Sequence, residues 1–98
     1  MARFLDADPA TLLLPTQRQS GADPWKLQRQ IARYGNSMSG MPMIWVVEDV
    51  DGRLEILDGV TRATRVAELA PGVRVTVEVI EVLNRPSRSR VTIADTIP

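Results

Sequence analysis

MIWVVEDVDGRLEIL, residues 43–57, decides the fold, because it has the pattern of two strands joined by a tight turn. Residues 43–50 are an almost continuous apolar run, which is typical of a strand that is covered on both faces and lies centrally in a sheet. Asp51-Gly52 is the two-residue signal of a β-hairpin. Residues 53–57 therefore form the second strand of that hairpin.

A helix is predicted before the hairpin, over residues 24–34. Asp23 is a good N-cap, and Pro24 suits the first helical position. Gly35 ends the pattern as helix C-termini often end. One face of this helix is apolar and consists of Leu27, Ile31 and Tyr34, at spacings of i, i+4 and i+7.

A second helix and a further strand follow the hairpin. Residues 59–70 carry an apolar stripe at helical spacing, and Pro71-Gly72 stops it. Residues 73–82 then alternate between valine and polar side chains, which predicts a strand with one buried face.

The two ends of the chain are less regular. Residues 4–15 contain two prolines and allow a short strand and one turn of helix at the edge of the core. Residues 91–98 form either a last short edge strand or a tail without regular secondary structure. The order of elements predicts an α+β fold, one small mixed β-sheet with packed helices, as a single domain over residues 1–98. Its core covers about residues 5–82, and residues 83–98 form a basic loop and tail.

Composition excludes several kinds of chemistry. The 98 residues include no cysteine and no histidine, so thiolate nucleophiles, disulfides and imidazole bases are absent. Lysine plus arginine total 12 against 12 acidic residues, so any attraction for phosphate must be local. The leucines at 12–14 are too few to span a membrane, and we expect a soluble, cytoplasmic protein without membrane contact. The aromatic residues Trp25, Tyr34 and Trp45 are expected in or beside the core.

The start of the second helix is the main candidate site. A helix N-terminus presents free N–H groups to an anion, and Gly59 before it allows a phosphate to approach. Thr61, Arg62 and Arg65 complete the set, with the two arginines on one face of the helix. The alternative is an ordinary turn, in which Asp58 caps the helix and the arginines are solvated or paired with acidic neighbours.

Two further clusters of charged residues are candidate sites. The carboxylates of Glu48, Asp49, Glu55 and Asp58 are candidates for a metal site, although the hairpin turn explains Asp51-Gly52 without a metal. Residues 85–90 contain Arg85, Arg88 and Arg90, which can follow a nucleic-acid backbone. The alternative for this segment is a solvated loop, which the neutral charge of the whole chain favours.

The order of these elements, together with Leu57-Asp58-Gly59, Arg62 and Ala67, resembles the ParB/sulfiredoxin-like domain over roughly residues 5–82. The resemblance is to a minimal, stand-alone member of that family. It implies that the helix start after Gly59 binds nucleotide phosphates, with a nucleoside triphosphate and Mg as the expected ligand.

The match is partial at the positions that carry the family's chemistry. Val60 and Thr61 stand where sulfiredoxins have a cysteine and a histidine and where partition proteins have a glutamate and an arginine. The missing cysteine excludes sulfinic-acid reduction, and we expect no helix-turn-helix segment after the sheet. Three hypotheses follow: a nucleotide- or phosphate-binding domain, a metal-dependent ParB-like nuclease, or a protein-interaction domain without a ligand.

Overall fold

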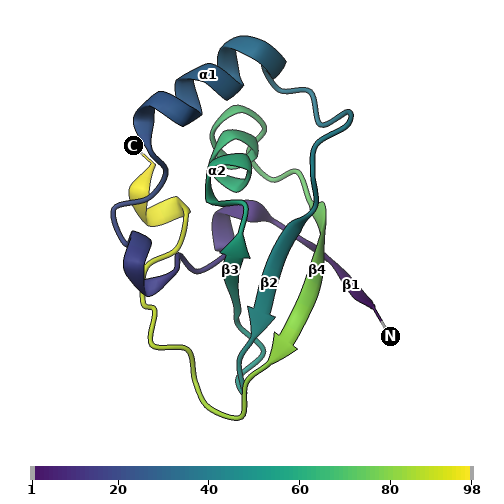
Figure 1. The fold of residues 1–98 in the computed structure, drawn as a ribbon, viewed down its shortest axis with the longest axis vertical. Helices are drawn as coiled ribbons and strands as arrows, with labels where there is room; N and C mark the ends of the chain where they lie inside the picture. Colours follow the sequence, from purple (N-terminus) through teal and green to yellow (C-terminus); the bar gives the residue numbers. More distant parts are fainter. Residues whose placement is uncertain (1, 98) are drawn as a thin grey trace.

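The computed structural model describes residues 2–97 and has an α+β fold in which two helices pack against one four-stranded mixed sheet (Figure 1). Three short 3-10 helices lie in the connections between these elements and near the C-terminus. The strands and α-helices, in chain order, are β1 Arg3–Ala7, α1 Pro24–Tyr34, β2 Ile44–Glu48, β3 Leu54–Asp58, α2 Val60–Leu69 and β4 Val75–Val82. The predicted fold class is confirmed.

The strand order is β1-β4-β2-β3. The sheet is mixed because β2 and β4 are parallel neighbours, while the other two neighbouring pairs are antiparallel. The turn at Asp51 and Gly52 makes β2 and β3 antiparallel neighbours. Helix α2 then carries the chain back across the sheet, so that β4 runs parallel to β2 with Ile44 opposite Val77. Strand β1 pairs antiparallel with β4 at the outer edge.

Helix α2 is the main cover of the sheet. Its side chains Ala63 and Val66 are almost fully buried, in one cluster with Ile44, Val46 and Val77 of the sheet. Helix α1 packs outside α2 and has no buried residue, and Leu27 and Ile31 of its apolar face are only half-buried. The molecule is therefore layered as sheet, α2 and α1 (Figure 1). None of the helices within residues 2–97 is long and apolar enough to cross a bilayer.

The edge of β3 is closed by two segments that are far apart in sequence. Leu13 donates its N–H to Leu54 O at 2.8 Å and accepts from Ile56 N–H at 2.9 Å. Val91 O in turn accepts from Leu14 N–H at 2.8 Å, and Thr92 bridges Leu13. Residues 91–93 thus take the edge position that was one of the two predictions for this segment.

Several local predictions are confirmed and others are wrong. The first helix has the predicted bounds, and β2 is central, between β4 and β3. The prediction that β2 is covered on both faces is wrong, because Trp45 points away from α2 and is 43% exposed. The core placement of Trp25 is also wrong, since it is 79% exposed on the side of α1 opposite Leu27.

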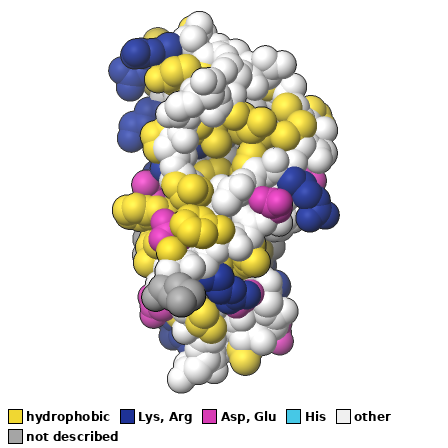
Figure 2. Space-filling model, turned by 90° about the vertical axis from the view of Figure 1, so that its right-hand side faces the viewer, with side chains coloured by type: hydrophobic (Ala, Val, Ile, Leu, Met, Phe, Trp, Pro, Cys, Tyr) yellow, Lys and Arg dark blue, Asp and Glu magenta, His cyan; other side chains and the backbone are white. Residues whose placement is uncertain are grey.

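Exposed apolar side chains are a general feature of the outer sheet face. Phe4 and Trp45 both lie opposite Glu78 in the strand register, and Phe4 is 52% exposed. Figure 2 shows hydrophobic side chains exposed at mid-height on this side of the molecule, and Lys and Arg side chains both near the end that carries α1 and in separate groups lower down.

Candidate anion-binding site

The N-terminus of α2 has no side-chain cap. Its N-cap residue is Gly59, with φ of 115°, a conformation that other residues rarely adopt. Asp58, the alternative cap considered from the sequence, does not cap the helix; its carboxylate accepts from Arg62 Nη2 at 3.1 Å. No side chain therefore competes with a ligand for the N–H groups of the first turn of α2.

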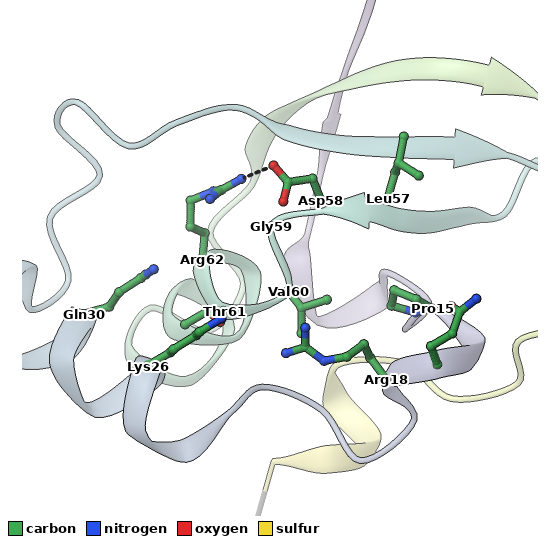
Figure 3. A pocket seen from close by; sticks show the side chains of 11 residues that line it. Pro15, Arg18, Lys26, Gln30, Leu57, Asp58, Gly59, Val60, Thr61 and Arg62 are labelled. Carbon is green, nitrogen blue, oxygen red and sulfur yellow. Dashed lines mark hydrogen bonds and ion pairs between the residues drawn. The ribbon is translucent and has the colours of Figure 1, made fainter.

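This helix end opens into a cavity of about 380 Å³, which we call the α2 cleft. Three of the predicted residues, Gly59, Thr61 and Arg62, line it. Arg18 and Lys26 extend into the same region from the segment after Pro15 and from α1 (Figure 3). With Asp58 as the one carboxylate in the lining, the α2 cleft carries three cations against one anion, a local positive charge in a chain with net charge zero.

Arg65, the fourth predicted residue, does not line the α2 cleft. Its side chain is directed towards the C-terminal end of α1, and Nη1 donates to Gly35 O at 2.9 Å and to Ser37 O at 2.7 Å. Its guanidinium also lies 5.4 Å from the centre of the Tyr34 ring. Arg65 is only 2% exposed, so it fastens the end of α1 to α2.

A second cavity, of about 140 Å³, brings Arg62 and Arg65 together, and we call it the Arg65 cavity. Gln30 and Arg62 line both cavities and form the boundary between them. The remaining walls of the Arg65 cavity come from Tyr34 and the loop before β2. The two arginines thus share a cavity as their spacing suggested, but beside the helix and not at its N-terminus.

The four carboxylates considered for a metal are held in separate interactions. Glu48 pairs with Arg3, and Glu55 accepts from the hydroxyl of Ser87. No group of three or more metal-ligating side chains occurs in the part of the chain that the structure describes.

Asp49 is the most enclosed of these carboxylates, with 3% exposure. It accepts from the backbone N–H of Ser87 at 2.9 Å, of Arg53 at 2.8 Å and of Asp51 at 3.0 Å, and from Arg53 Nε. These donors, the Ser87 N–H first, hold the pKa of Asp49 below its ordinary value, because they stabilise the charged form more than burial penalises it. Asp49 therefore ties the β2–β3 turn to the C-terminal segment.

Arg85, Arg88 and Arg90 are exposed, and they alternate with serines that are buried. Ser87 and Ser89 anchor the loop, and Arg90 Nη1 donates to Ser87 O at 2.9 Å. This segment adjoins the β2–β3 turn, at the opposite end of the hairpin from the α2 cleft.

Five polar residues of the two cavities were missed from the sequence: Gln17, Arg18, Lys26, Gln30 and Ser39. Arg18 lies between the irregular segment at 4–15 and the predicted helix at 24–34, and Lys26 and Gln30 belong to a helix far from Gly59 in sequence. No short motif contains them. The one available signal was the polar side of the helix at 24–34, which begins with Lys26.

No protein-family model matches the chain, and no curated protein or solved structure matches it either. The resemblance to the ParB/sulfiredoxin-like domain stays a prediction.

Proposed function

We propose that the protein is a small phosphate-binding domain of the ParB/sulfiredoxin-like kind, which holds the phosphates of a nucleotide in the α2 cleft. One observation carries the proposal: an uncapped helix N-terminus opens into a cavity that Arg18, Lys26 and Arg62 surround. The free N–H groups and the positive end of the helix dipole attract an anion, and the cations reinforce that attraction.

The cavity also suits a ligand of this size. Its volume of about 380 Å³ lies within the usual range of small-molecule sites. Arginine can donate two parallel hydrogen bonds to one phosphate, whereas Lys26 acts as a point charge. Pro15 and Leu57 add an apolar wall on which the nucleoside can rest.

The sequence resemblance supports binding and not catalysis. Gly59 and Arg62 match the family's phosphate-binding pattern, while Val60 and Thr61 occupy the positions of its reactive or charged residues. Val60 is buried in the core, so it offers no group to a substrate. We therefore propose a regulatory or partner-dependent domain that senses a nucleotide.

A calorimetric titration tests the proposal. Inorganic triphosphate, ATP, CTP and GTP are added in turn to the wild-type protein, with and without Mg²⁺. Arg18→Ala and Lys26→Ala should each weaken triphosphate binding by about tenfold, because each removes a charge-assisted contact. Arg29→Ala is the matched control, since Arg29 is exposed on α1 and lies outside the α2 cleft. Absence of binding at millimolar ligand would contradict the proposal.

The exposed arginines at 85, 88 and 90 favour a second candidate function, contact with a nucleic-acid backbone. Their removal should reduce the salt dependence of binding to a single-stranded oligonucleotide by roughly one phosphate contact for each arginine. If a protein partner is found whose binding does not change with Arg62→Ala, the interaction-domain hypothesis replaces both.

A further inference from the structure

Three buried side-chain polar atoms lack a hydrogen-bond partner within residues 2–97, and they are Gln30 Oε1, Arg62 Nε and Arg65 Nε. All three residues line the Arg65 cavity. Buried polar atoms are nearly always paired, with protein or with a bound molecule, because an unpaired one costs about 1–3 kcal/mol. Because all three residues line one small cavity, a group bound in that cavity would lie beside these atoms and could pair with them.

The charges around the cavity specify the sign of that group. Arg65 is 2% exposed, and its partners are backbone carbonyl groups, a methionine sulfur and an aromatic ring. No carboxylate pairs with Arg65 among the ion pairs of the described chain, whereas Arg62 has Asp58. A buried cation of this kind is stabilised by an anion that enters its cavity.

The unpaired atoms also specify the hydrogen-bonding pattern. Two N–H donors, one from each arginine, require a group that accepts twice, and Gln30 Oε1 requires a group that donates once. One ordered water could make these three hydrogen bonds. However, the cavity of about 140 Å³ is several times larger than the roughly 30 Å³ that one water occupies in the liquid, so a single water would not fill it. A tetrahedral oxyanion that keeps one proton can make the three hydrogen bonds, has the negative charge that the buried arginine requires, and fits the volume of the cavity.

We propose that the Arg65 cavity is a second anion site, separate from the α2 cleft, which binds a hydrogen phosphate ion. Its oxygens accept from Nε–H of Arg62 and Arg65, and its hydroxyl donates to Gln30. Arg62 and Gln30 stand between the two cavities, so occupancy of one site alters the environment of the other. The aromatic ring of Tyr34 and the chain at 39–42 enclose the group.

Side-chain NMR gives a direct test with inorganic phosphate as the probe. The Nε–H resonances of Arg62 and Arg65 should both shift in a saturable manner as phosphate is added, while those of the exposed Arg29 and Arg33 should not. Sulfate, which has no proton to donate at neutral pH, should bind about tenfold more weakly than phosphate, a difference of one hydrogen bond. Acetate is titrated as a comparison ligand, and its affinity shows how tightly the cavity binds an anion that has a carboxylate in place of a phosphate group.

Two variants test this site, and Arg65→Lys separates it from the α2 cleft, because Arg65 lines the Arg65 cavity and not the α2 cleft. Gln30→Met keeps the length and packing of the side chain and should lower phosphate affinity to the level of sulfate. Arg65→Lys keeps the charge, loses Nε–H and should weaken phosphate binding further; if this variant does not fold, Gln30→Met still tests the site. Lys26→Ala is the control, because Lys26 lines only the α2 cleft and should leave the Arg65 shift unchanged.

The outcomes are distinct. A phosphate-dependent shift of Arg65 Nε–H that Gln30→Met weakens supports the second site. A shift confined to Arg62 means that phosphate enters the α2 cleft alone, and no saturable shift of either arginine means that the cavity holds water only; both results overturn the inference. Triphosphate binding at the α2 cleft is measured separately, by comparing the wild type with Lys26→Ala. Failure of the proposed function is therefore distinguished from failure of this inference.

Discussion

The two ends of the β2–β3 hairpin use the same kinds of side chain in opposite ways. At the turn end, the Asp49 carboxylate is surrounded by donors from Arg53, Asp51 and Ser87. At the α2 end, the helix N-terminus is uncapped and two buried arginine Nε–H groups are unpaired. The cluster at the turn is satisfied within the protein and joins the turn to the C-terminal segment, whereas the α2 end leaves N–H groups with which the proposed anions would pair.

The largest effect is expected from removal of the satisfied cluster. Asp49→Ala leaves three backbone N–H groups without their acceptor and should give the greatest fall in melting temperature of the variants discussed here. The control is Asp51→Ala, whose side chain is 63% exposed and whose removal should change stability by less than about 0.5 kcal/mol. Equal melting temperatures for the two variants would show that the cluster does not hold the C-terminal segment.

Gly59→Ala should have the next largest effect, at the unsatisfied end. A Cβ at this residue would lie 3.1 Å from Ile44 Cγ1, and the φ of 115° is strained for alanine, so we expect a loss of about 2 kcal/mol. Gly52→Ala shares the positive φ but meets no atom within 4 Å, and it should cost about 1 kcal/mol. Urea unfolding of both variants separates the contact with Ile44 from the backbone strain.

The pH dependence of stability should also distinguish the two ends. The pKa of Asp49 is lowered in the folded protein, so its contribution is fully present above the ordinary carboxyl pKa of about 4. That contribution is lost as pH falls through the folded pKa. Melting temperatures measured from neutral to acidic pH should therefore fall more steeply below about pH 4 in the wild type than in Asp49→Asn. Parallel curves for the two proteins would contradict this account.

Asp58→Asn should have the smallest effect on stability and a clear effect on binding. The Asp58 side chain is 62% exposed, and its i,i+4 pair with Arg62 should contribute less than about 0.5 kcal/mol. Because the variant removes the only carboxylate of the α2 cleft and releases Arg62, triphosphate affinity without Mg²⁺ should rise severalfold. Unchanged affinity would place the phosphates away from Arg62.

Local signals in the sequence predicted much of the fold. Asp23, Pro24 and Gly35 define the bounds of α1, and Asp51-Gly52 defines the hairpin, because capping and turn conformations depend on a few adjacent residues. The predicted strand at 43–50 was too long, since Asp49 already belongs to the turn and accepts from the Gly52 N–H through its carbonyl.

Features that depend on distant residues were not predictable in the same way. Trp45 was expected near the core because aromatic residues are usually buried, but the sheet has a second layer on only one face at that point. For the candidate site, Gly59 and Arg62 were found from local chemistry. Arg18, Lys26 and the burial of Arg65 depend on how α1 packs on α2, which no short stretch of sequence contains.

The pairing of residues 12–14 with residues 91–93 has a consequence for the time course of folding. Leu12 and Leu14 are buried core residues, yet the hydrogen bonds from Leu14 to Val91 and from Ile93 to Leu12 join segments that are about 80 residues apart in sequence. Strand β1 likewise pairs only with β4. Such non-local contacts slow folding relative to a helical protein of equal length. During synthesis, Leu12 and Leu14 thus remain without these hydrogen-bond partners until residues 91–93 have left the ribosome.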